Sequence, residues 1–274
     1  NGIGVMCCRV MLPGKIQVFL VSHHDALGRN RIDRSDSDDA FCFHPLCKRF
    51  FQSGFFALKP KARLVFRRKK RDKINITYLF TVQNRFSFYG IQTPKRRALY
   101  KSFLANEKKS EKLDWAFLKQ VWQDDHRECQ YLVLDYLRTM QRFLTYDDIE
   151  KLEYFARSKQ WWDSIDILAV VIGRIGLTDE RVDKVMKAWA HDDNIWLCRL
   201  AILHQLGRKD QTKIDLLQEI LLRNLGSKEF FINKAIGWAL RDLSKTNAAW
   251  VRQFIMTNKE HLSPLSVREA SKYL

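Results

Sequence analysis

The stretch Ser227-Lys-Glu-Phe-Phe-Ile-Asn-Lys-Ala-Ile-Gly-Trp-Ala-Leu-Arg-Asp-Leu-Ser-Lys-Thr-Asn247 decides the fold of this chain. Four apolar residues recur at i, i+4, i+7 and i+8, on one face of a helix: Phe231, Ala235, Trp238 and Ala239. Three cations recur at i, i+7 and i+11 on a neighbouring face: Lys234, Arg241 and Lys245. Gly237 in mid-helix costs about 1 kcal/mol relative to alanine, so we expect a large group or another backbone to approach there.

The composition indicates a helix-rich chain with a strong basic excess. Its 274 residues include 8 Trp but only 11 Gly and 5 Pro, and the length is ample for a hydrophobic core. No apolar run approaches the roughly 18 residues of a membrane-spanning helix, so we expect a soluble protein. The net charge of +17 favours a polyanionic partner, such as nucleic acid or an anionic membrane surface.

The cysteines do not form a disulfide framework. Four of the six lie within the first 47 residues, and the other two, Cys129 and Cys198, fall inside helical patterns. Cys42-Phe-His44-Pro-Leu-Cys47 offers three zinc ligands, but no second pair follows at metal-ligand spacing. We therefore expect reduced thiols, as in the cytoplasm, and no metal.

Residues 1–76 differ in texture from the remainder. An apolar run over 16–21, an acidic patch over 33–39 and a basic run over 67–71 follow one another without a lasting helical or strand period. Charge blocks of this kind are usually solvated. We interpret the segment as an irregular, poorly ordered basic extension ahead of a domain over 77–274.

From residue 77 onwards the pattern is helical throughout. Gly90-Ile-Gln-Thr-Pro94 is typical of a loop whose Thr93 and Pro94 start a helix. No alternating strand pattern competes, so this domain is predicted to be all-α. The predicted helices are 95–105, 113–123, 128–143, 146–158, 161–175, 180–190, 194–206, 212–225, 229–243, 248–258 and 265–274.

A related pattern recurs about every 35 residues, in the second helix of each pair. It is seen in Trp161-Trp-Asp-Ser-Ile-Asp-Ile-Leu-Ala, Ile195-Trp-Leu-Cys-Arg-Leu-Ala-Ile-Leu, Phe230-Phe-Ile-Asn-Lys-Ala-Ile-Gly-Trp and Leu265-Ser-Val-Arg-Glu-Ala. This period is typical of two-helix solenoid repeats, which stack into a curved array. The second helices then line a concave face, where their polar and aromatic exceptions share one groove: Trp162, Asp166, Arg199, Lys234, Trp238 and Arg241.

Four segments carry the most specific pattern in the chain. They are Gly90-Ile-Gln-Thr-Pro-Lys-Arg-Arg97, Trp161-Trp-Asp-Ser-Ile-Asp166, Asp193-Asn-Ile-Trp-Leu-Cys-Arg199 and residues 227–247. Together, in order over about 81–274, they resemble the AlkD-like DNA alkylation repair glycosylases. The resemblance implies a right-handed-type solenoid of HEAT-like repeats with a basic concave groove. It also implies removal of N3- and N7-alkylated purines, such as 3-methyladenine and 7-methylguanine, from duplex DNA without any cofactor.

We accordingly expect a base excision repair enzyme for alkylation damage whose partner is duplex DNA containing alkylated purines. It is expected to be a monomer without a metal or a membrane partner. Its expected location is the cytoplasm, in association with the nucleoid through DNA.

The chemistry of this reaction agrees with the residues of the predicted groove. A purine alkylated at N3 or N7 is cationic, so its glycosidic bond is weak and the departing base needs no proton. One carboxylate then suffices, whereas most sugar hydrolases use two. Asp166 is predicted to stabilise the oxocarbenium-like sugar and to orient the attacking water. Trp162 precedes it by one helical turn on the same face, and Trp238 supplies a second aromatic wall that attracts a cation by about 0.5–2 kcal/mol.

The resemblance assigns the catalytic cleft to Asp166, Trp162 and Trp238, and it implies a lesion that stays stacked during the reaction, without base flipping. Arg199 matches the family's DNA-contacting arginine. The predicted contacts to the DNA backbone are Arg199, Arg241, Lys245, Lys234 and Thr93.

The chain departs from the family pattern in three places. Thr81 stands where the family usually carries Tyr, residues 1–76 replace the expected first helix, and the chain stops at Leu274, short of a full terminal helix. Loss of a cap exposes apolar surface in a solenoid. We therefore expect a complete groove in a less stable domain.

Two other functions fit a basic helical array: a non-catalytic nucleic-acid-binding module and a protein-interaction scaffold. An acidic side chain inside a phosphate-binding groove weakens binding unless it does chemistry, so Asp166 favours the enzyme over the binding module. A scaffold predicts an apolar or mixed concave face and poor affinity for DNA, which a salt-dependent binding measurement distinguishes from the other two.

Overall fold

The computed structural model describes residues 6–12, 15–21 and 85–274. The chain divides into two compact units, Asn1–Ala57 and Leu58–Leu274. The basic run over 67–71, the Cys42 to Cys47 segment and Thr81 lie outside the described residues, so the predicted domain boundary at residue 76 stays a prediction.

The first unit contains a β-hairpin. Strand β1 (Met6–Leu12) pairs antiparallel with strand β2 (Lys15–Val21), with Met6 opposite Val21 and Leu12 opposite Lys15. We expected no strand period in this region. The hairpin is explained by two apolar runs that flank the dipeptide Pro13-Gly14, which is a turn signal. The first of these runs carries no regular alternation, and this is why periodicity did not reveal it.

Residues 93–274 consist of helices joined by short connections, so the predicted all-α class of this part of the chain is confirmed. The α-helices are α4 (Thr93–Ser110), α5 (Trp115–Trp122), α6 (Arg127–Thr139), α7 (Ile149–Arg157), α8 (Trp162–Ile175), α9 (Arg181–Trp189), α10 (Ile195–Leu203), α11 (Ile214–Asn224), α12 (Phe230–Leu243), α13 (Ala248–Thr257) and α14 (Pro264–Ala270). Two predicted helices, 128–143 and 265–274, end in the 3-10 turns η2 (Gln141–Phe143) and η5 (Ser271–Tyr273). Two further 3-10 turns are η3 (Tyr146–Asp148) and η4 (Lys209–Gln211).

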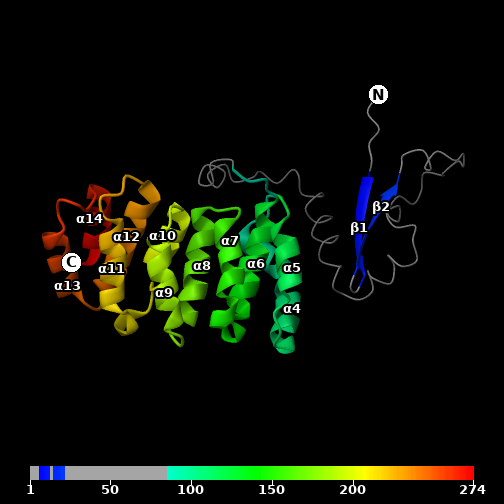
Figure 1. The fold of residues 1–274 in the computed structure, drawn as a ribbon, viewed down its shortest axis with the longest axis horizontal. Helices are drawn as coiled ribbons and strands as arrows, with labels where there is room; N and C mark the ends of the chain where they lie inside the picture. Colours follow the sequence, from blue (N-terminus) through cyan, green and yellow to red (C-terminus); the bar gives the residue numbers. More distant parts are fainter. Residues whose placement is uncertain (1–5, 13–14, 22–84) are drawn as a thin grey trace, which may run out of the picture. The chain divides into compact units, whose positions relative to one another are not determined.

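The helices follow one another along a row in chain order (Figure 1), and their contacts divide them into two layers. The even-numbered helices from α4 to α14 pack side by side in chain order, which makes one continuous layer. Each odd-numbered helix from α5 to α13 packs against at least one even-numbered neighbour. Among the helices of residues 85–274, none has the length and hydropathy needed to traverse a bilayer. The even-numbered layer carries most of the predicted site residues.

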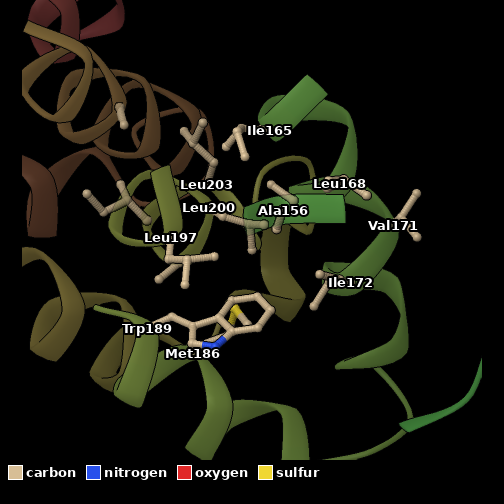
Figure 2. Close-up of a cluster of buried hydrophobic side chains, with 14 of the residues drawn as sticks. Ala156, Ile165, Leu168, Val171, Ile172, Met186, Trp189, Leu197, Leu200 and Leu203 are labelled. Atoms are coloured by element: carbon tan, nitrogen blue, oxygen red, sulfur yellow. The ribbon is translucent and has the colours of Figure 1, made fainter. Parts of the chain in front are cut away.

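The hydrophobic core runs between the layers. Figure 2 shows Leu168 and Ile172 of α8, Met186 and Trp189 of α9 and Leu200 of α10 around one part of it, and all five are buried. Full burial of each large apolar side chain contributes about 1.5–3 kcal/mol. This packing fixes the position of α8 relative to α10, and these two helices carry Asp166 and Arg199.

Two glycines permit close contact between helices of the even-numbered layer. A Cβ atom added to Gly237 of α12 would lie 2.6 Å from Cβ of Glu269 and 3.0 Å from the carbonyl oxygen of Ser266, both on α14. The expectation that another backbone approaches Gly237 is therefore confirmed. A Cβ atom added to Gly173 of α8 would lie 1.8 Å from the carbonyl oxygen of His204, directly after α10.

Ion pairs cross four of the contacts between even-numbered helices. In each pair the cation and the carboxylate are 33–38 residues apart, about one repeat. The pairs are Arg97–Asp135 (α4 to α6), Arg127–Asp163 (α6 to α8), Arg199–Asp166 (α10 to α8) and Lys234–Glu269 (α12 to α14). Arg127 and Arg199 are buried, and breaking a buried pair leaves an uncompensated charge, so at least these two pairs favour the observed register of neighbouring repeats.

Candidate active site

Asp166 lies in the second turn of α8 and accepts two hydrogen bonds from Arg199 of α10. Arg199 Nε donates to Oδ1 at 2.8 Å and Nη2 donates to Oδ2 at 2.9 Å. The Arg199 side chain is 1% exposed, whereas that of Asp166 is 23% exposed. The buried guanidinium therefore fixes the orientation of a carboxylate that solvent still reaches.

The third guanidinium nitrogen of Arg199 also donates a hydrogen bond within the protein. Its Nη1 donates to the carbonyl oxygen of Phe231 at 2.6 Å, so all three guanidinium nitrogens donate within the protein. The Phe231 ring packs against both Trp161 and Trp196, with centroid separations of 5.1 and 5.0 Å. The predicted contact of Arg199 with phosphate stays a prediction.

Trp238 of α12 lies next to the same guanidinium. The Arg199 Cζ atom is 5.2 Å from the centroid of the Trp238 ring, and Lys234 Nζ and Arg241 Cζ are each 5.9 Å from it. The structure thus joins Asp166, Arg199, Trp238, Lys234 and Arg241 in one cluster. We call these five residues the α8–α12 cluster.

Trp162 was predicted as the first aromatic wall of the cleft. It is the first residue of α8, is half-buried, and precedes Asp166 by one helical turn. Its neighbour Trp161 is 3% exposed and belongs to the hydrophobic core. The role of Trp162 stays a prediction.

The remaining predicted DNA contacts occupy different surroundings. Lys234 Nζ and Arg241 Nη1 each donate to the Glu269 carboxylate of α14 at 2.9 Å. Lys245, just after α12, pairs with Asp242 at 3.1 Å and keeps 52% of its side chain exposed. Thr93 is exposed at the start of α4. These contacts to DNA also stay predictions.

The loop ahead of Thr93 is anchored by a buried carboxylate that the sequence did not reveal. Glu128 of α6 accepts hydrogen bonds from the backbone N–H groups of Tyr89, Gly90 and Ile91 at 3.1, 2.9 and 3.2 Å. Hydrogen bonds to a charged acceptor are about twice as strong as neutral ones. Glu128 therefore fixes the position from which α4 begins.

A second ion pair on α8, between Arg127 and Asp163, resembles the Arg199–Asp166 pair but is less exposed to solvent. Arg127, which is fully buried, donates to Asp163 through Nε at 3.3 Å and also through Nη2. The hydroxyl of Tyr131 donates to the same carboxylate at 2.5 Å. Since only 8% of the Asp163 side chain is exposed, Asp166 is the carboxylate of α8 that a substrate can reach.

The protonation of Asp166 reflects opposing influences. Burial raises the pKa of Asp166 above its ordinary value, while the hydrogen bonds and the charge of Arg199 lower it and the charge of Asp163 raises it further. The net effect is a raised pKa. Arg199 therefore favours the ionised carboxylate at a site where burial disfavours it.

Sequence analysis missed Asp163, Glu128 and Glu269. Asp163 and Glu269 fall inside the quoted repeat segments, and each has a cation of opposite charge one repeat length away. That spacing is the signal that points to both residues. For Glu128, whose partners are backbone N–H groups, the sequence holds no comparable signal.

Comparisons with known proteins identify one family. A model of the family described as DNA alkylation repair enzyme matches residues 63–274. A solved structure described as a predicted DNA alkylation repair enzyme from Enterococcus faecalis is 33% identical, with a TM-score of 0.66 over 75% of this chain and 96% of that one. The Pseudomonas fluorescens alkylpurine DNA glycosylase AlkC, bound to DNA containing an abasic site analog, is 20% identical, with a TM-score of 0.36 over 54% of this chain and 47% of that one.

A search of curated proteins gives no match. The family model covers well over half of the chain, and the similarity to the Enterococcus faecalis protein extends along nearly all of that protein. This chain therefore belongs to the DNA alkylation repair enzyme family.

Proposed function

We propose that this protein is an AlkD-like DNA glycosylase that hydrolyses the N-glycosidic bond of cationic N3- and N7-alkylated purines in duplex DNA. The observation that carries the proposal is the Asp166 carboxylate, partly exposed and held by the buried fork of Arg199 beside the Trp238 ring. In a groove that only binds phosphate, an accessible carboxylate fixed in this way would repel the ligand and weaken binding.

In this reaction the protein has only to stabilise the sugar cation and to orient the attacking water. The electron pair of the glycosidic bond leaves with the base, which departs as a neutral alkylpurine, and positive charge develops on the sugar. The oxygen of a water molecule then bonds to C1′ and the water loses a proton to Asp166 or to solvent. Asp166 stabilises the sugar cation through its charge and orients the water through a lone pair that Arg199 does not occupy.

Release of an intact base tests this proposal. Incubation of methylated duplex DNA with the purified chain is expected to liberate 3-methyladenine or 7-methylguanine and to leave an unbroken strand with abasic sites. In parallel, log K for undamaged duplex is expected to fall linearly with log salt, by about 0.9 per phosphate neutralised. Salt-sensitive binding without base release would point to the non-catalytic binding module, and binding that does not respond to salt would point to the scaffold.

Arg199→Lys is expected to shift the pH dependence of base release. Lysine keeps the positive charge but replaces the two-point fork with a single donor, so the pKa of Asp166 rises further above its ordinary value. Because the ionised carboxylate is the active form, the acidic limb of the single-turnover rate moves to higher pH.

The matched control is Arg127→Lys, which makes the same change in the ion pair of Asp163. Its acidic limb is expected to coincide with that of the parent chain. Equal shifts in both variants would contradict a specific link between Arg199 and Asp166.

A further inference from the structure

The ring of Trp238 is surrounded by positive charge. Cations of Arg199, Lys234 and Arg241 all lie within 6 Å of its centroid. An aromatic face attracts a cation, but each of these charges repels a further cation brought to the same place. A groove that accepts a cationic base therefore needs negative charge close to Trp238.

Glu269 supplies that charge from the neighbouring helix. Its side chain is 6% exposed and accepts hydrogen bonds from Lys234, Arg241 and Lys272, each at 2.9 Å. The hydrogen bonds from Lys234 and Lys272 lower the pKa of Glu269 to about 2, so it is ionised at neutral pH.

The position of Glu269 depends on Gly237. Gly237 directly precedes Trp238 in the chain. A Cβ atom added to Gly237 would lie 2.6 Å from the Cβ atom of Glu269, so a larger residue at position 237 would displace Glu269. The carbonyl oxygen of Asn233 on α12 also accepts a hydrogen bond from the Ser266 hydroxyl at 2.8 Å, which fixes α14 in this register. One carboxylate oxygen of Glu269 thus pairs with Lys234 and the other with Arg241, the two cations of α12 that lie near the ring.

We infer that Glu269 is a positioning residue that holds Lys234 and Arg241 beside the Trp238 ring and balances their charge, so that this aromatic wall accepts a positively charged sugar or base. The inference rests on the proposed function and extends it to selectivity. In the α8–α12 cluster together with Glu269, three cations face two carboxylates, and loss of the Glu269 charge changes their net charge from +1 to +2.

Glu269→Gln preserves the shape of the side chain and removes its charge. At an effective dielectric constant of about 20, one uncompensated unit charge about 6 Å away weakens binding of a cation by a factor of about 100. The same change frees Lys234 and Arg241 for phosphate. We therefore expect unchanged or tighter binding of undamaged duplex, with a steeper salt dependence, together with weaker selection of a cationic site.

The test compares two duplex probes that require no turnover. One carries a protonated azasugar, which mimics the charged sugar, and the other carries a neutral tetrahydrofuran abasic analogue. The parent chain is expected to prefer the charged probe, and Glu269→Gln is expected to reduce this preference about 10- to 100-fold. If both probes weaken by the same factor, Glu269 has a structural role only and the inference is wrong.

Asp242→Asn is the matched control on α12. Asp242 pairs with Lys245 and accepts a hydrogen bond from the Gly207 N–H, so this variant also adds one net positive charge but leaves the ion pairs of Lys234 and Arg241 with Glu269 intact. It is expected to bind undamaged duplex more tightly and to keep the parent's preference for the charged probe. An equal loss of preference in Asp242→Asn would show that total charge, and not Glu269, sets selectivity.

A second variant tests the inference if Glu269→Gln folds poorly. Lys234→Gln alone removes one of the cations beside Trp238 and is expected to increase the preference for the charged probe, whereas no increase would contradict the inference. The ratio of the affinities for the charged and the neutral probe also separates this inference from the proposed function. A parent chain that prefers the charged probe but releases no base would contradict the glycosylase only, and a parent without that preference would overturn the role of Glu269.

Discussion

Replacement of Asp166 by Asn is expected to slow base release by about 10²- to 10³-fold, the usual effect of removing one electrostatic stabiliser of a transition state. Asparagine fills the same space and can still accept a hydrogen bond from Arg199, but it carries no charge to stabilise the sugar cation. The single-turnover rate on methylated duplex DNA measures this loss directly.

The variant also leaves a buried arginine without its carboxylate, which costs stability by itself. Asp163→Asn is the appropriate control, because it removes the carboxylate partner of Arg127, a fully buried arginine, from the same helix. We expect Asp163→Asn to lower thermal stability at least as much as Asp166→Asn while keeping most of the activity. Similar losses of activity in both variants would assign Asp166 a structural role.

Gly173→Ala is expected to give the largest loss of stability. The new Cβ atom would lie 1.8 Å from the His204 carbonyl oxygen, which belongs to backbone and cannot rotate away. Overpacking of this kind costs about 3 kcal/mol or more, which for a domain of this size lowers Tm by about 6–12 °C. Since the clash forces α8 away from α10, the Asp166–Arg199 pair and base release are also expected to weaken.

Gly207→Ala provides the control for Gly173→Ala. Gly207 has a φ of +80° and no heavy atom within 4 Å of the added Cβ, so alanine costs only the backbone strain of about 1 kcal/mol. Thermal unfolding followed by circular dichroism compares the two variants. A Gly173→Ala variant that melts within 2 °C of Gly207→Ala would show that the contact between α8 and α10 adjusts easily.

The helical fold could be predicted from the sequence because the signals for each helix lie within its own residues. Apolar residues recur with the helical period, and Pro94 and Pro264 mark the starts of α4 and α14. Gly237 also signalled a close approach, and α14 supplies it. The hairpin of β1 and β2 was not predicted, since its first strand lacks the alternation that reveals a half-buried strand.

The site was only partly predictable, for a physical reason. The side chains of Asp166, Arg199 and Trp238 were found by their types and positions, and the structure places them in one cluster. Their hydrogen-bond partners depend on how repeats stack, which no local pattern encodes. Hence the hydrogen bonds from the buried Arg199 to Asp166 were not predicted, and Glu269 was not connected with Lys234 although it lies one repeat away.

The most direct test of the proposed glycosylase is single-turnover release of free 7-methylguanine and 3-methyladenine from methylated duplex by the parent chain and by Asp166→Asn. Each protein is used at a concentration above its measured Kd for DNA. We predict rapid release by the parent and a loss of at least about 100-fold in the variant, with DNA binding retained. Salt-sensitive binding by the parent without release of either base, or equal rates for the two proteins, would contradict the assignment of Asp166 as the catalytic carboxylate.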